Sequence, residues 1–149
     1  MDIYNYIKKD HETVSKLMEQ IASSKDPKQR AQLFTTMCEE LMIHAKSEEQ
    51  TFYQALEERG GKQLQEKEEH AEEEHDEIES YIQQLNTMDP AEAKWLVTFG
   101  SLKKAVEHHV HEEEGEIFEK AKKVISDTQA ERLADQMDQL KHEISSEAA

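Results

Sequence analysis

The chain has 149 residues and a formal net charge of −16, from 34 acidic and 18 basic side chains. An excess of negative charge repels phosphate, which argues against nucleic acid or an anionic membrane surface as a partner. The length fits a single domain over residues 1–149 with one substantial core. With only four Gly and two Pro and a third of the residues charged, the composition is typical of an all-helical fold.

Sequence features also bear on location. No apolar run approaches the roughly 20 residues that span a bilayer, and residues 1–6 lack the basic and apolar regions of a secretory signal. Cys38 is the single cysteine and cannot form an internal disulfide, which favours a reducing compartment. We therefore predict a cytoplasmic protein without a membrane partner, in which Cys38 is a partly buried and unreactive thiol.

The first predicted helix covers about residues 3–22. Its apolar side chains follow the 3–4 spacing of a core-facing stripe, and His11 stands where that stripe should have an apolar residue. A turn follows, in which Asp26 is a good N-cap residue. Pro27 suits the first position of the next helix, where its missing N–H does no harm.

The second predicted helix runs from Pro27 to about residue 58. His44 and Glu48 lie four residues apart in the middle of its apolar stripe, so they share one face of the helix. Gly60 and Gly61 end this helix, because glycine adopts the left-handed conformation at little cost.

The third predicted helix covers about residues 62–86. His75 lies on its apolar stripe, together with Ala71 four residues earlier. His70 lies about 100° away from the stripe, toward the edge of the helix.

The fourth predicted helix begins at Asp89 and Pro90, which repeat the earlier start signal, and extends to about residue 125. His109 and Glu113 are again four residues apart on an apolar stripe. Gly115 lies inside this helix at a cost of about 1 kcal/mol relative to alanine. A short last helix over about residues 127–146 has Thr128 and Glu131 at the spacing of a capping box, and its His142 is predicted to be solvated.

The four long helices form a repeat. Residues 10–21 resemble residues 74–85, and residues 44–53 resemble residues 109–118. One helix pair in each repeat predicts two helical hairpins related by a pseudo-twofold axis, and hence a four-helix bundle.

The inward histidines and glutamates indicate a metal site. The alternative interpretation is an acidic, solvated surface whose stripe is misplaced by 100°. About a third of helical positions face the core, so four histidines on four inner stripes by accident is on the order of one in a hundred. Neutral histidines can be satisfied by hydrogen bonds, but two additional core carboxylates need a cation.

The order His, His-x-x-x-Glu, His, His-x-x-x-Glu over about residues 3–125 resembles the hemerythrin-like cation-binding domains. The resemblance implies an up-down-up-down four-helix bundle with an oxo- or hydroxo-bridged pair of iron ions. Imidazole and carboxylate also suit manganese or zinc. By resemblance the terminal ligands are four histidines and the bridging ligands are two glutamates: His11, His44, His75 and His109, with Glu48 and Glu113.

This chain departs from the oxygen-carrying hemerythrins at two places. Those proteins have His-x-x-x-His on the third helix, where this chain has Ala71, with His70 one residue earlier. They also have an offset of five on the fourth helix, which His108 to Glu113 or His109 to Glu114 would match. We prefer His109 with Glu113 because the repeat matches them to the His44 pair, and we keep His70 and His108 as additional candidate ligands. A ferritin-like site needs two Glu-x-x-His motifs, and Glu72 to His75 is the single one here.

Three functional hypotheses follow. The preferred one is a di-iron protein that senses or reacts with oxygen, peroxide or nitric oxide, or responds to iron supply. The second is a reversible oxygen binder. The third is a non-catalytic bundle with a structural or adventitious metal such as zinc.

Overall fold

A computed structural model describes residues 1–148; residue 149, the last of the predicted domain, lies outside the described part. All regular structure in residues 1–148 is helical, which confirms the predicted all-α class. The long helices are α1 (Ile3–Ser23), α2 (Pro27–Glu48), α4 (Lys62–Asn86), α5 (Ala93–Glu112) and α7 (Asp127–Ala148). Shorter segments extend two of them: η1 (Glu49–Tyr53) and α3 (Gln54–Arg59) after α2, and η2 (Glu113–Ile117) and α6 (Phe118–Ala121) after α5.

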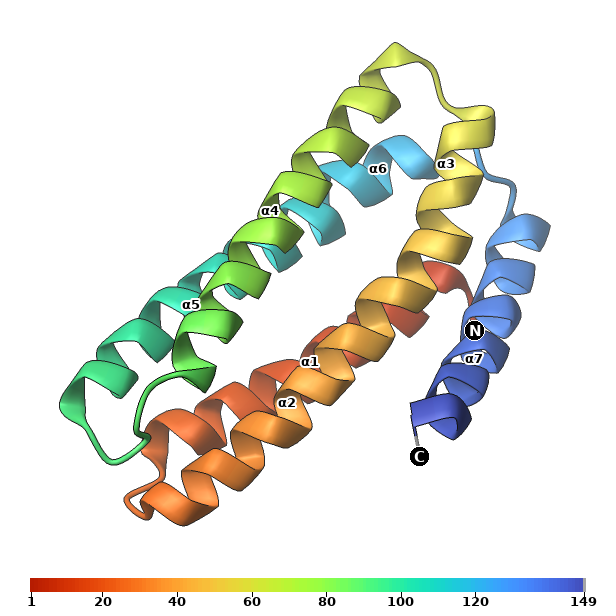
Figure 1. The fold of residues 1–149 in the computed structure, drawn as a ribbon. Coiled ribbons are helices and arrows are strands. Elements are labelled where there is room, and N and C mark those ends of the chain that lie inside the picture. The colour runs from red at the N-terminus through yellow and green to blue at the C-terminus, as the bar shows by residue number, and fades with distance from the viewer. Residues whose placement is uncertain (149) are drawn as a thin grey trace.

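The long helices pair into two hairpins. α1 packs along α2, and α4 packs along α5, while α1 also contacts α5. The last helix, α7, lies against α1, α2 and η1 at the side of the first hairpin (Figure 1). No helix in the described residues is long and apolar enough to cross a membrane.

The glycine at the end of α3 is required by close packing, not by a left-handed backbone conformation. Both Gly60 and Gly61 have negative φ angles, so the left-handed termination predicted from the sequence is wrong. A Cβ built on Gly60 would lie 2.5 Å from the Leu64 side chain and 2.6 Å from the Leu56 carbonyl oxygen. Glycine is needed here because α4 begins directly against the end of α3.

The fourth long helix is shorter than the sequence predicts. Asp89 accepts a hydrogen bond from the Ala91 N–H at 2.9 Å and closes a turn, so α5 begins at Ala93 and not at Pro90. At the other end α6 stops at Ala121, and a turn over residues 122–126 precedes α7.

The capping box of α7 also differs from the prediction. Ser126 Oγ accepts a hydrogen bond from the Gln129 N–H at 3.2 Å, and Gln129 Oε1 accepts one from the Ser126 N–H at 3.1 Å. This reciprocal pair satisfies two free N–H groups at the helix start. It stands two residues before the predicted pair of Thr128 and Glu131.

Two π-helical segments, η1 and η2, interrupt the second and fourth long helices. They stand within one residue of matching places in the repeat: η1 begins directly after Glu48, and η2 begins at Glu113. A π-helical turn holds an extra residue, and such turns often mark functional sites. In η1 the consecutive side chains of Thr51, Phe52 and Tyr53 are all buried, an arrangement that a regular helical stripe does not produce.

The interior is divided into two apolar clusters. Ile7 belongs to the cluster toward the N-terminus of α1, and Val14 belongs to the cluster toward its C-terminus. His11 lies between them on the same helix and is itself buried. A layer of polar side chains thus lies inside the bundle between two apolar halves of the core.

Candidate metal site

The structure brings the six predicted ligand residues together in this polar layer. Glu48 and Glu113 have no exposed surface, and three of the four histidines are buried. His75 is less enclosed, with 18% of its side chain exposed. The six side chains come from four helical elements and from the start of η2: His11 of α1, His44 and Glu48 of α2, His75 of α4, His109 of α5 and Glu113 of η2.

The ligand atoms form two groups that share a glutamate. Atoms within 4.8 Å of one another come from His11, His44, Glu48 and Glu113 in one group, and from Glu48, His75 and His109 in the other. Glu113 spans both groups as well, because its oxygens lie 3.2 Å from His11 Nε2 and 3.3 Å from His109 Nε2. Each glutamate therefore lies between the two pairs of histidines.

The histidine pairs have nearly the same geometry. The rings of His11 and His44 are 5.2 Å apart at 64°, and those of His75 and His109 are 4.5 Å apart at 66°. The pseudo-twofold repeat of the sequence therefore extends to the orientation of the side chains.

Each histidine is held from outside by a carboxylate at its Nδ1 atom. Asp10 contacts His44 at 2.8 Å, and Glu74 contacts His109 at 3.0 Å. The four contacts, all between neighbouring helical elements, are Asp10 with His44, Glu74 with His109, Glu114 with His11 at 2.7 Å and Glu49 with His75 at 3.4 Å.

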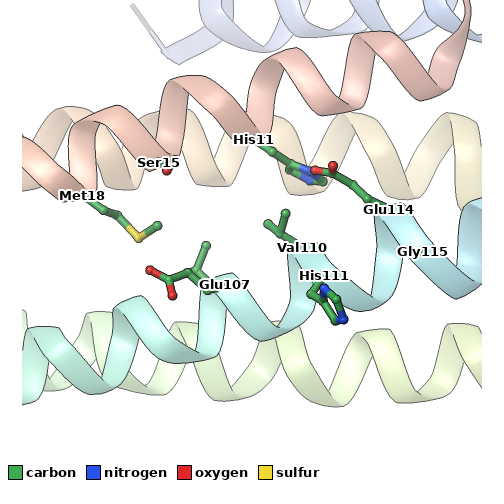
Figure 2. Close-up of a pocket in the computed structure, with 9 residues that line it drawn as sticks. His11, Ser15, Met18, Glu107, Val110, His111, Glu114 and Gly115 are labelled. Carbon is green, nitrogen blue, oxygen red and sulfur yellow. The ribbon is translucent and has the colours of Figure 1, made fainter.

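These four carboxylates were not identified from the sequence, although the repeat contains a signal for them. Asp10 and Glu74 each directly precede a histidine of the site, and Glu49 and Glu114 each directly follow a glutamate of the site. Figure 2 shows one such contact, with His11 of α1 and Glu114 of η2 pointing toward each other. Carboxylates in this position fix the tautomer of a ligating histidine and turn its Nε2 atom inward.

Several inward atoms have no hydrogen-bond partner within the protein. These buried atoms are His11 Nε2, His44 Nε2, Glu113 Oε1 and both carboxylate oxygens of Glu48. Each of the two nitrogens lies 3.2 Å from a carboxylate oxygen of this set without making a hydrogen bond to it. Buried polar groups are rarely left unpaired, since each costs free energy. Two nitrogen donors beside carboxylate oxygens form a donor set that suits divalent transition metals. The residues therefore fit a pair of cations.

The pKa values of the buried groups show that the two central glutamates need positive charge beside them when no cation is bound. Burial, together with repulsion from Glu113, raises the pKa of Glu48 to about 7. Burial opposes protonation of His44 and His109, but the neighbouring carboxylates outweigh it and raise the pKa of each ring to about 10. The charge of the two central glutamates is thus balanced by protons wherever no metal is bound.

Tyr53 makes the two glutamates unequal. Its hydroxyl donates a hydrogen bond to Glu113 Oε2, and burial followed by the negative charge of Glu113 raises the pKa of Tyr53 well above its ordinary value. The hydroxyl therefore stays protonated. The repeat aligns Tyr53 with Phe118, which has no hydroxyl to donate.

The remaining histidines lie away from this layer. His70 and His108, the additional candidate ligands, are 50% and 62% exposed and contact Glu74 and Glu112 on the outside of α4 and α5. The structure places neither in the two central groups. His142 is exposed, as the sequence predicts.

An apolar cavity of about 450 Å³ reaches the histidines from between α2 and α4. Cys38 lines it and is partly buried, and burial raises the pKa of this thiol to about 11. Leu41, Ile78 and Val106 give the cavity an apolar wall. A small uncharged molecule would therefore meet an apolar path to the polar layer.

Comparison with known proteins connects this geometry to a family. Residues 2–121 match the hemerythrin HHE cation-binding domain, which confirms the resemblance seen in the sequence. A curated relative from Nostoc sp., named a DNA nickase, is 26% identical over 145 residues; these cover 97% of this chain but 40% of the relative. The crystal structure of a hemerythrin HHE cation-binding domain-containing protein from Mycobacterium kansasii superimposes with a TM-score of 0.82. It is 23% identical, and the match covers 96% of this chain and 89% of that chain.

Proposed function

The chain belongs to the hemerythrin HHE cation-binding family, and we propose that its polar layer binds two iron ions that react with or sense a small molecule. In this proposal His11 and His44 hold one ion, His75 and His109 hold the other, and Glu48 and Glu113 bridge them. An oxide or hydroxide would complete the bridge, and the four long helices would form an up-down-up-down bundle around it. The gathering of unpaired buried nitrogen and carboxylate atoms into two adjoining ligand groups is the observation that supports the proposal.

Bound iron would supply Lewis acidity and a change of oxidation state, and the protein would supply the surroundings. Glu49 and Glu114 orient His75 and His11 from outside, so that each Nε2 atom points inward. Tyr53 donates a hydrogen bond to one bridging carboxylate and keeps its proton. The apolar side chains of the cavity would disfavour water beside the layer.

The small molecule is proposed to be oxygen, peroxide or nitric oxide. If each ion takes six ligands, four histidines, two bridging carboxylates and one bridging oxygen would leave one coordination position free on each ion. His70, which could fill one of these positions, lies outside the site. Two free positions favour reaction or sensing over reversible oxygen carriage.

Iron is favoured over a structural zinc ion because the two ligand groups are joined by shared glutamates. A structural zinc site is usually closed by four ligands around one ion. Manganese remains a chemically suitable occupant of the same oxygen and nitrogen ligands.

Cleavage of DNA is not part of the proposal. The curated relative named a DNA nickase is more than twice as long as the part matched here, and a net charge of −16 opposes contact with phosphate. A nicking assay on supercoiled plasmid, with iron-loaded protein, is expected to show no cleavage.

Elemental analysis and near-ultraviolet absorption test the proposal. Protein produced with iron available should contain two irons per chain and absorb in the near-ultraviolet, as oxo-bridged ferric pairs do. Glu48→Ala and Glu113→Ala should each lose both ions, whereas His142→Ala should lose neither. Retention of two irons by Glu48→Ala would exclude the bridging role, and a colourless zinc protein would exclude the iron site.

A further inference from the structure

A second cluster of histidines and glutamates lies on the outer face of the α4–α5 hairpin. His70 and Glu74 are four residues apart on α4, and His108 and Glu112 are four residues apart on α5. One ligand atom from each side chain lies within 4.8 Å of the other three. We propose that these four side chains bind one divalent cation of the zinc class, separate from the cations of the polar layer.

The spacing of the four side chains fits tetrahedral coordination. Four ligands at about 2.1 Å from a zinc ion lie about 3.4 Å from one another. His108 Nε2 lies 3.0 Å from a Glu112 oxygen and 3.3 Å from Glu74 Oε2. His70 Nε2 lies 3.2 Å from the other Glu112 oxygen and 3.7 Å from Glu74 Oε2. Both Nε2 atoms and both carboxylates therefore already surround a common point.

Glu74 gives the independent reason to expect a ligand. Its side chain is only 8% exposed, and its Oε2 atom is buried without a hydrogen-bond partner. That atom faces the Nε2 atoms of His70 and His108. A buried carboxylate oxygen needs a hydrogen-bond donor or a cation. The side chains beside Glu74 Oε2 are those of the cluster, so a cation bound there would satisfy this oxygen.

The charges around the cluster also favour a cation. A further carboxylate, that of Glu73, lies 4.0 Å from His70 Nδ1. Two histidines and two carboxylates leave no net positive charge to repel a divalent cation, and the whole chain is strongly acidic. Electrostatics thus favour a cation at this face.

Glu74 connects this surface site to the interior. One of its oxygens accepts a hydrogen bond from His109 Nδ1 at 3.0 Å, and the other belongs to the surface cluster. A cation at the surface would withdraw electron density from the carboxylate that supports His109. This effect on the interior rests on the proposed function, whereas binding at the surface does not.

Zinc binding by the full-length, metal-free protein tests the inference. Equilibrium dialysis followed by elemental analysis would compare the parent with the double variant His70→Ala/His108→Ala. Because both side chains are at least half exposed, the fold should survive, and a melting curve would check this. The matched control is His111→Ala/His142→Ala, which removes two histidines outside the cluster.

The parent and the control should each bind one more zinc ion per chain than the double variant. Glu112→Gln should lower the affinity of the cluster for that zinc ion at least tenfold, although both histidines remain. Equal stoichiometry in parent and double variant would overturn the surface site. The number of zinc ions per chain separates the two proposals. One ion in the parent and none in the double variant would support the surface site and count against the interior pair. Two ions in both proteins would support the interior pair and count against the surface site.

Discussion

The two hairpins orient their histidines alike but differ in what satisfies the outer carboxylate. In the first hairpin, Asp10 contacts His44 with one oxygen and Lys141 of α7 with the other, at 2.6 Å. In the second hairpin, Glu74 contacts His109 with one oxygen, and its other oxygen has no hydrogen-bond partner. A lysine of the protein thus neutralises one carboxylate, while the second oxygen of the other faces the exposed side chains of His70 and His108.

The difference follows from the position of α7. This helix packs on α1, α2 and η1, and Tyr6 donates a further hydrogen bond to Asp138 of α7 at 2.7 Å. Lys141 of α7 therefore lies beside the first hairpin, where it contacts Asp10. The added helix α7 therefore makes the outer surroundings of the two hairpins unequal, beside the inner difference between Tyr53 and Phe118.

Removing the metal should have the largest effect, because it takes the shared partner from both hairpins at once. A ligand at a thousand times its dissociation constant adds about 4 kcal/mol to the free energy of unfolding. For a domain of this size that corresponds to a melting temperature about 8–16 °C higher. Calorimetry of iron-loaded and chelator-treated protein measures the difference, and equal melting temperatures would favour an adventitious metal.

Tyr53→Phe tests the inequality between the two central glutamates. The change removes the one hydroxyl that donates to Glu113. Hydrogen bonds to charged groups contribute about 1.5–3 kcal/mol, so we expect a loss of that size in the free energy of unfolding, measured by urea denaturation of metal-free protein.

Tyr4→Phe is the matched control, since Tyr4 is also buried but its hydroxyl has no hydrogen-bond partner. This variant should be neutral or slightly more stable. Equal losses in the two variants would show that the contact with Glu113 carries no special weight.

Asp10→Asn and Glu74→Gln compare the outer carboxylates directly. Each should weaken iron retention by about 10–100-fold, because a neutral amide supports a ligating histidine less well than a carboxylate does. Competition with a chromophoric chelator measures this loss. The two variants should differ in a second respect: Glu74→Gln should also weaken zinc at the surface cluster, and Asp10→Asn should not. Equal zinc binding by the two variants would remove Glu74 from that cluster.

Periodicity predicted the six inward side chains because each one lies on the apolar stripe of its own helix. Cap and turn residues predicted the start of α2 at Pro27 and the break before α4. The outer carboxylates could not be found in this way. Asp10, for example, is one residue from His11, so it points about 100° away from the stripe and contacts a histidine on the next helix. A pattern within one helix shows such a residue only as a surface acid.

The π-helical segments were missed for a related reason. An extra residue in one turn leaves the apolar spacing on either side intact, so the stripe through Phe52 suggests a regular helix. What reveals the wider turn is the burial of Tyr53 directly beside Phe52. The buried Tyr53 hydroxyl donates a hydrogen bond to Glu113, sixty residues later in the chain, and a pattern within one helix does not show such a partner.

Gly115→Ala should have the smallest effect and addresses the same comparison at the π-helical segments. The repeat aligns Gly115 of η2 with Gln50 of η1. Because a residue with a side chain occupies the same place in the first hairpin, the segment itself does not require glycine. A Cβ added to Gly115 meets no atom within 4 Å, and Gly115 lines the cavity shown in Figure 2. Replacing a helical glycine by alanine stabilises by about 0.5–1 kcal/mol, so the melting temperature should rise by about 1–4 °C with iron content unchanged.

Gly100→Ala, in the regular part of α5 with equally open space, is the control. A fall in stability for Gly115→Ala beside a rise for Gly100→Ala would show that the second π-helical segment, unlike the first, depends on its glycine.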